Sequence, residues 1–126
     1  MPELGQIQMT TQTQHGKIEI SSAAIASIAS QAVLESYGVV GMASRSFKDG
    51  LVESLSPGTS HRGVDVRLQD GQIIIDLYVI VEYGTRISEV AHNMMAAVKF
   101  RVEKALGTSV AQVNVYVQGL RVSQED

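Results

Sequence analysis

Apolar and polar residues alternate along short segments of the chain, and these segments are separated by two longer ones with helical spacing. The alternation over Lys17-Ile18-Glu19-Ile20 predicts a short strand, after which Ser21 or Ser22 is placed to cap a helix. From residue 23 to residue 37 the spacing predicts a helix that ends at Gly38. Its stripe of apolar and small side chains consists of Ile25, Ile28, Ala29, Ala32 and Ser36.

A hairpin is predicted in the middle of the chain. Val39 and Val40 first restart the apolar pattern and predict another short strand. Residues 64–68 alternate cleanly, Asp70-Gly71 is a two-residue turn signal, and residues 73–81 are rich in β-branched side chains. These three segments together are typical of two antiparallel strands joined by a tight turn.

A second helix is predicted over residues 86–106, with Gly107 in the position of a left-handed cap. Alternation then predicts a last strand over residues 113–117. The apolar stripe of the helix consists of Ile87, Val90, Ala91, Met94, Val98, Val102 and Ala105.

The predicted elements follow the order β-α-β-β-β-α-β, and each helix has a single apolar stripe to bury. We therefore expect an α+β fold, a two-layer sandwich in which a small, mostly antiparallel sheet carries two main helices on one face. Three segments follow from the pattern: a flexible polar tail over residues 1–16, a single domain over 17–122 and a polar C-terminal end over 123–126.

Composition narrows the classes of function. The chain has 126 residues, enough for one domain, and no cysteine, which excludes disulfides, iron–sulfur sites and thiol nucleophiles. The formal net charge of -3 argues against nucleic acid as a partner. The longest apolar stretch, residues 73–81, is interrupted by Asp76 and is too short to cross a membrane. We expect a cytoplasmic protein that reaches a membrane only through a partner.

No catalytic or metal-binding pattern stands out. His15, His61 and His92 have no ligand-like spacing, and no serine lies in a nucleophile elbow, so we expect no cofactor, no metal and no enzymatic activity. Pro2 could act as an N-terminal base of the kind that tautomerases use, but the polar tail separates it from the first predicted strand.

One motif supports an alternative function. Gly38-Val39-Val40-Gly41 has the Gly-x-x-Gly form with which KH domains clamp a nucleic-acid backbone. Its two central valines favour burial, whereas a phosphate clamp needs exposed and usually basic residues. A KH-like RNA-binding domain therefore stays as the second hypothesis.

Apolar side chains expected at the surface point instead to protein binding. Phe100 projects to the side opposite the core stripe of the second helix, and Leu34 does the same on the first. Ile74, Tyr78 and Ile80 lie on the outer side of the second hairpin strand. These five residues form the predicted interaction surface, used for self-association or for a protein partner.

The chain also resembles the alkaline shock protein family of mainly Gram-positive bacteria. The resemblance covers about residues 16–122, and no single motif carries it; the order and spacing of all of them do. The segments that carry it are 16–21, 28–29, 38–42, 49–50, 63–66, 75–84 and 113–117.

The resemblance implies a small, cytosolic, non-enzymatic protein with a role in cell-envelope stress, held near the membrane by a membrane-anchored relative. It also implies a partner related to dihydroxyacetone kinases and a link to lipid metabolism. The family has no established catalytic residues, so none is carried over to this chain.

Overall fold

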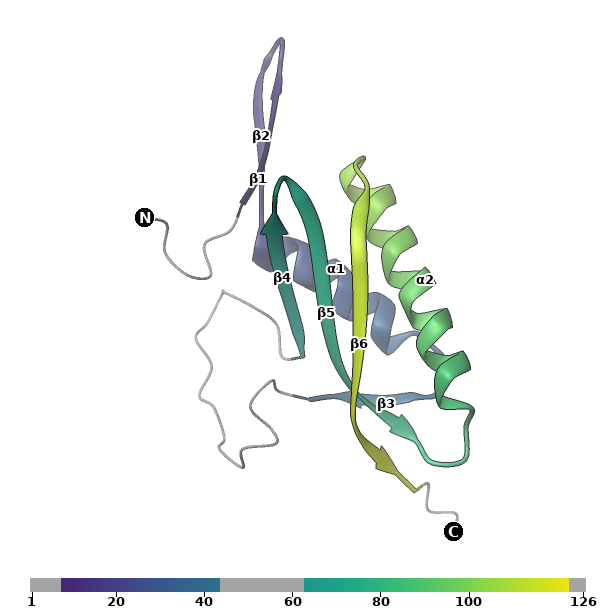
Figure 1. The fold of residues 1–126 in the computed structure, drawn as a ribbon. Coiled ribbons are helices and arrows are strands. Elements are labelled where there is room, and N and C mark those ends of the chain that lie inside the picture. Colours follow the sequence, from purple (N-terminus) through teal and green to yellow (C-terminus); the bar gives the residue numbers. More distant parts are fainter. Residues whose placement is uncertain (1–7, 44–62, 123–126) are drawn as a thin grey trace.

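The computed structural model describes residues 8–43 and 63–122 and has the expected α+β class (Figure 1). Within these residues, two helices and six strands follow the order β1-β2-α1-β3-β4-β5-α2-β6. The strands are β1 (Gln8–Thr13), β2 (Gly16–Ser21), β3 (Val39–Met42), β4 (Val64–Gln69), β5 (Gln72–Glu82) and β6 (Val110–Arg121). The helices are α1 (Ser22–Leu34) and α2 (Ile87–Leu106).

Strand β5 is the centre of the main sheet. Strand β4 pairs antiparallel with residues 72–77 of β5, and β3 pairs antiparallel with residues 79–81. Strand β6 follows β5 in parallel from residue 73 to residue 82. The sheet is therefore mostly antiparallel, as expected, and its one parallel pair arises because α2 returns the chain to the same end of the sheet.

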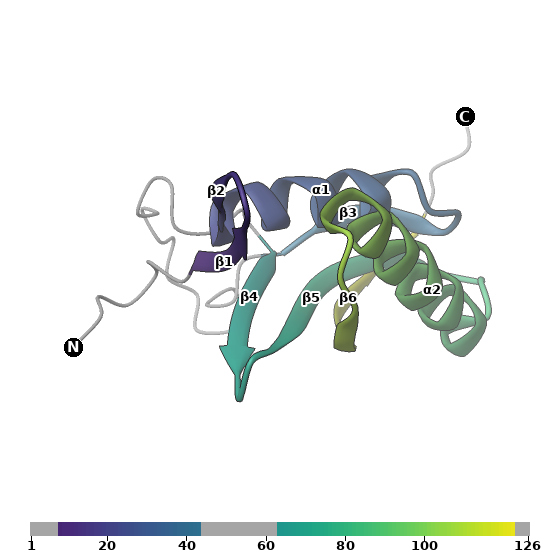
Figure 2. The same ribbon diagram turned by 90° about the horizontal axis from the view of Figure 1, so that it is seen from above.

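The core lies between this sheet and the two helices, which cover the same face (Figure 2). On β5 the side chains of Ile75, Leu77, Val79 and Val81 are all 0% exposed. The buried residues of α2 are Val90, Met94, Val98 and Val102. Ile87 and Ala105 were predicted on the same stripe but are exposed, because they lie in the first and last turns of the helix.

Local signals in the sequence explain where the elements begin and end. The Ser21 hydroxyl accepts the Ala24 N–H at 3.2 Å and caps α1. Asp70 and Gly71 have φ values of 55° and 77°, as a tight hairpin turn requires. Helix α2 ends at Gly107, whose φ of 76° is left-handed.

The expectation of a flexible tail over residues 1–16 needs correction. Residues 8–13 form β1, which pairs antiparallel with β2 to make a hairpin that projects from the main sheet (Figure 1). Threonine is β-branched and favours strands, and the Thr13 hydroxyl stabilises the turn by bonding the Gly16 carbonyl at 3.0 Å. Residues 1–7 and 123–126, with the predicted polar end, lie outside the described residues.

Side chains of α2 hold the start of β6. The Lys99 ammonium donates to the Val110 carbonyl at 3.0 Å, and the Glu103 carboxylate accepts the Val110 N–H at 2.8 Å. Lys99 and Glu103 also pair with each other at 3.1 Å. The Val110 N–H, followed by Lys99, holds the pKa of Glu103 below its ordinary value of 4.5.

We expect acid to weaken this junction. A carboxyl whose pKa is lower in the folded state stabilises the fold above its unfolded pKa, and this contribution is lost as the pH falls through the folded value. Glu103→Gln should therefore lower the free energy of unfolding by more at pH 7 than at pH 3, because acid shifts the wild-type carboxyl towards its protonated form. Urea denaturation at both pH values measures the difference. An equal loss at pH 3 and pH 7 would contradict the assignment.

Candidate interaction surface

The structure divides the five predicted surface residues between opposite faces of the molecule. Leu34 and Phe100 lie on the helical layer and are 58% and 62% exposed. Ile74, Tyr78 and Ile80 belong to β5, on the sheet face that the helices leave uncovered. They do not form one continuous surface, because the sheet and its core lie between the two groups.

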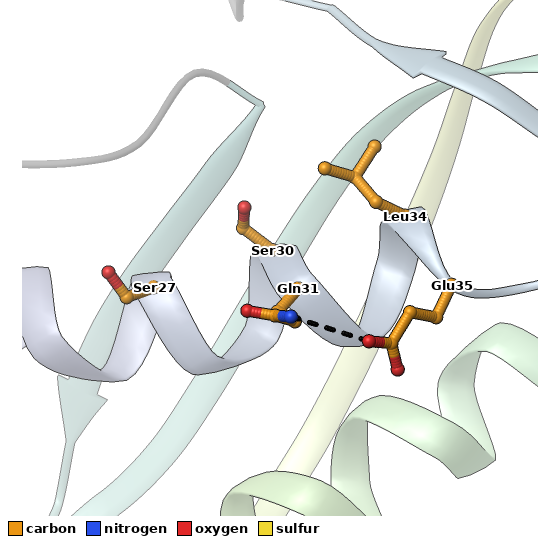
Figure 3. Close-up of a pocket in the computed structure, with 5 residues that line it drawn as sticks. All are labelled: Ser27, Ser30, Gln31, Leu34 and Glu35. Atoms are coloured by element: carbon orange, nitrogen blue, oxygen red, sulfur yellow. Dashed lines mark hydrogen bonds between the residues drawn. The ribbon is translucent and has the colours of Figure 1, made fainter.

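Leu34 lies beside a shallow hollow on the outer side of α1 (Figure 3). The hollow measures about 400 Å³, and its other lining residues include Ser27, Ser30 and Gln31. Figure 3 shows Leu34 directed away from α2, and Glu35 directed towards it. The hollow thus combines one apolar side chain with small polar ones.

Glu35 ties the two helices together. Its carboxylate accepts from Arg101 of α2 at 2.8 Å and from Gln31 at 3.3 Å. The hydrogen bond from Arg101 is the largest influence that lowers the pKa of Glu35. Because both partners of this ion pair are solvated, we assign it a role in orienting the helix ends and little net stabilisation.

Phe100 is the more exposed of the two large hydrophobic side chains that α2 presents at the surface, the other being Ile87. The Lys104 ammonium lies 5.7 Å from the centre of the Phe100 ring, at the distance of a cation–π contact. This contact shields one face of the ring and leaves the side chain 62% exposed.

The sheet face that the helices leave uncovered carries a stacked pair of aromatic rings. Tyr78 of β5 and Tyr116 of β6 are register partners, and their rings stack with centroids 5.0 Å apart at 17°. Such a pair is worth about 0.5–1.5 kcal/mol beyond the area that it buries. We call this surface the tyrosine face and define it by Arg67, Asp76, Tyr78, Ile80, Asn114 and Tyr116.

A polar network fixes one end of the tyrosine face. Arg67 of β4 donates to both carboxylate oxygens of Asp76, at 3.0 and 3.2 Å, and Asn114 of β6 donates to Asp76 at 2.9 Å. Asp76 is 6% exposed, so its charge is buried but fully partnered. Hydrogen bonding to Asp76 raises the pKa of the Arg67 guanidinium. Three strands are therefore locked together through side chains on this face.

This network also corrects the expectation for Ile74. Ile74 lies opposite Arg67 in the register and is 8% exposed. Arg67 is the register partner of Ile74, and its guanidinium bonds Asp76, two residues further along β5. Ile74 lies on the same side of β5 as the tyrosine face but is almost fully buried, so it contributes little exposed surface.

Sequence reasoning missed several exposed apolar residues at one end of the molecule. They lie where β3, the ends of β5 and β6 and the first turn of α2 meet (Figure 1). The residues are Tyr37, Val40, Tyr83, Ile87, Leu120 and Val122. Leu120 and Val122 had a signal in the sequence, because they continue the alternation of the last strand beyond Gly119.

The described residues contain no cluster of three or more side chains suited to a metal ion. In the same part of the chain, neither helix has the length and apolar character needed to cross a membrane. His15 and His92 are exposed at separate places, on the β1–β2 turn and on α2. Pro2 and His61 lie outside the described residues.

The Gly-x-x-Gly motif lies in a strand rather than in a loop. Gly38 precedes β3, Val39 pairs with Val81, and Gly41 pairs with Ile80. The Gly38 carbonyl accepts the Glu82 N–H at 2.9 Å. A KH clamp presents its backbone to a nucleic acid, whereas this segment is committed to the sheet.

Comparisons with known proteins agree with the resemblance. A family model described as alkaline shock protein 23, with a cell envelope-related function, matches residues 10–122. The chain belongs to this family. It is 51% identical to the uncharacterized protein YloU of Bacillus subtilis strain 168. The alignment spans 112 residues, which are 88% of this chain and 93% of the relative.

A second relative is an uncharacterized protein of Streptococcus pyogenes serotype M6. It is 41% identical over 115 residues, which is 90% of this chain and 95% of the relative. No solved structure matches the chain. Membership of the family gives the chain a cell envelope-related function, and the family description names no reaction.

The backbone at Gly38 generates a prediction about the family segment 38–42. Gly38 has a φ of 90°, and a Cβ built on it would lie 2.8 Å from Cγ2 of Val90. Gly38→Ala should therefore lower the free energy of unfolding by about 1–3 kcal/mol through backbone strain and overlap. Gly41→Ala is the matched control, because its Cβ would meet nothing within 4 Å. Equal losses for the two variants in thermal denaturation would refute this reading.

Proposed function

We propose that the chain is a non-enzymatic protein-interaction module that serves the cell envelope by binding a protein partner through the tyrosine face. The observation that carries the proposal is the stacked pair of Tyr78 and Tyr116 on a sheet face that no described helix covers. The proposed place of action is the cytoplasm, near the membrane through a partner, in a response to envelope stress.

The composition of the tyrosine face is that of a binding surface. Tyrosine and arginine are enriched at the centres of protein interfaces, where large side chains give contact area with few rotatable bonds. Tyr116 is 42% exposed, and the side chain of Arg67 is 46% exposed although it is paired with Asp76. A complementary partner would present apolar side chains to the tyrosines and a hydrogen-bond acceptor to Arg67.

Preorganisation also supports this assignment. The hydrogen bonds of Asp76 hold Arg67 and Asn114 in place before any partner arrives. Ordering side chains on association costs about 0.5–1.5 kcal/mol for each flexible side chain. A face whose polar groups are already fixed avoids much of that cost. By contrast, Leu34 and Phe100 are single exposed residues on the helical layer, and we assign them a secondary contact.

Two partners follow from the family resemblance. One is a membrane-anchored relative, which would place the chain at the membrane. The other is a protein related to dihydroxyacetone kinases, which would connect the chain to lipid metabolism. Each can be purified and tested directly against this chain.

Tyr116→Ser should weaken binding to the true partner at least tenfold, because it removes the outer ring of the stack. Binding is measured by titration calorimetry with each purified candidate, and by a pull-down with and without nuclease. Tyr37→Ser is the matched control, because Tyr37 is 83% exposed and lies outside the tyrosine face. Phe100→Ser, in parallel, measures the contribution of the helical layer.

Unchanged affinity for a folded Tyr116→Ser protein would remove the tyrosine face from the proposal. Unchanged assembly of a folded Phe100→Ser protein would remove that residue alone. If capture from a lysate disappeared with nuclease for the wild type, the KH-like alternative would replace the proposal, and salt-sensitive RNA binding would then be expected.

A further inference from the structure

Two glycines lie on either side of Ile80 on the sheet face that the helices leave uncovered (Figure 2). Gly41 of β3 and Gly119 of β6 are both register partners of Ile80 in β5. Residues directly opposite each other on neighbouring strands direct their side chains to the same face. This row therefore carries one side chain, that of Ile80, where three neighbouring strands could carry three. We call these three residues the glycine row.

The backbone does not require glycine at either end of the row. Neither Gly41 nor Gly119 is among the described glycines with a positive φ. Each follows an irregularity of the ladder, because the register passes over Val40 in β3 and over Gln118 in β6. A bulge needs glycine only where its backbone is left-handed. These two irregularities therefore do not explain the two glycines.

Packing within the chain does not require these glycines either. A Cβ built on Gly41 or on Gly119 would meet no atom of the described residues within 4 Å. Gly38 and Gly63 differ, because a Cβ on either would lie 2.8 Å from a neighbouring side chain. Glycine inside a strand weakens the fold, since it loses more conformational freedom on folding and packs no side chain. Close approach of another molecule to the backbone is the reason for glycine that this geometry leaves.

The surroundings of the glycine row suit an apolar group. All three of its residues are half-buried, so solvent reaches the row. Two residues earlier along β5 lies the stacked pair of Tyr78 and Tyr116. Two residues later the register places Glu82 beside Arg121, an acid beside a base, which adds no net charge. An apolar side chain can be buried on this row without a polar partner, whereas an ionised one would lose its water there.

The spacing of the two open positions favours a helix over a strand as the occupant. Neighbouring strands lie about 4.8 Å apart, so Gly41 and Gly119, on opposite sides of β5, are separated by about 10 Å. A helix rises about 1.5 Å per residue and brings side chains seven positions apart to the same side at about 10.5 Å. An extended strand repeats its faces at about 6.7 and 13 Å, and neither distance matches.

We propose that the partner binds the tyrosine face through an amphipathic helix that lies across β3, β5 and β6. Bulky apolar side chains of this helix would lie over Gly41 and Gly119, seven positions apart, and a small residue between them would lie over Ile80. The stacked tyrosines would line one side of the helix. This inference rests on the proposed function, since it concerns the same face, and it adds the chemistry of the partner.

Filling one open position separates binding from folding. Gly119→Val should leave the melting temperature unchanged or raised, because valine favours strands and no described atom obstructs its Cβ. Its affinity for the true partner should fall about tenfold or more, as titration calorimetry with the purified membrane-anchored relative and the kinase-related protein measures. Gly119→Ala, which adds less volume, should lose less affinity. Ala111→Val is the matched control, because Ala111 is exposed near the opposite end of the same strand.

Tyr116→Ser in the same titrations distinguishes this inference from the proposed function. If Tyr116→Ser weakens binding and a folded Gly119→Val protein does not, the helix is overturned and the tyrosine face remains the binding surface. If neither variant changes the affinity, or the wild type binds neither candidate, both are overturned. A mass in light scattering that rises with concentration, and that Gly119→Val returns to 13.6 kDa, would assign the row to a second copy and overturn the partner helix.

Cross-linking measures the spacing directly. Because the chain has no cysteine, Val40→Cys and Gln118→Cys each introduce a single thiol beside one glycine of the row and leave that glycine unchanged. A benzophenone attached to each thiol should cross-link, in the complex, to one helix of the partner at positions about seven residues apart, which mass spectrometry identifies. Cross-links to separate segments of the partner, or to an extended one, would overturn the helical occupant.

Discussion

Strand β5 forms hydrogen bonds along both of its edges, and the positions of the other main elements follow from this. Its odd-numbered side chains, from Ile73 to Val81, are 0–2% exposed and form the centre of the core. Both helices must therefore lie on the odd-numbered face, where their own apolar stripes are buried. The even-numbered face is left to contacts between side chains on neighbouring strands.

Asp76 makes this arrangement specific. A carboxylate in an apolar strand is tolerated only where partners replace its water, and here they come from Arg67 on one neighbouring strand and Asn114 on the other. If β5 shifted by one residue relative to its neighbours, Asp76 would face the core and would lose both partners. The same three side chains that fix the register also hold the polar end of the tyrosine face. The fixed positions of the side chains on the tyrosine face are thus a consequence of the strand register.

The sequence predicts those features that depend on neighbouring residues, and it fails where distant segments meet. Helix α2 and the Asp70-Gly71 hairpin were predicted because periodicity and turn chemistry are local properties. The helical pattern likewise placed Leu34 and Phe100 at the surface. The stacking of Tyr78 on Tyr116 was not predicted, since it depends on the parallel return of β6.

The errors have equally specific causes. Strand β1 was missed because its signal is the β propensity of threonine in a self-paired hairpin, with no apolar alternation to detect. Ile74 was assigned to the surface from alternation alone, which correctly identifies its face of the sheet. Its exposure, however, depends on the long side chains opposite it on the two neighbouring strands, Arg67 on β4 and Gln112 on β6, and these pairings are not local in the sequence.

The parallel return of β6 also explains why the two edges of the sheet are unequal. Strand β4 is joined to β5 by a two-residue turn and is short, whereas α2 brings the chain back far enough for β6 to follow β5 over almost its whole length. A long outer strand presents many backbone groups, and α2 satisfies only those of Val110. The helix that makes β6 possible also lies along the outer side of this strand (Figures 1 and 2), so the longest edge of the sheet is flanked by a helix and the shorter, charged β4 forms the other edge.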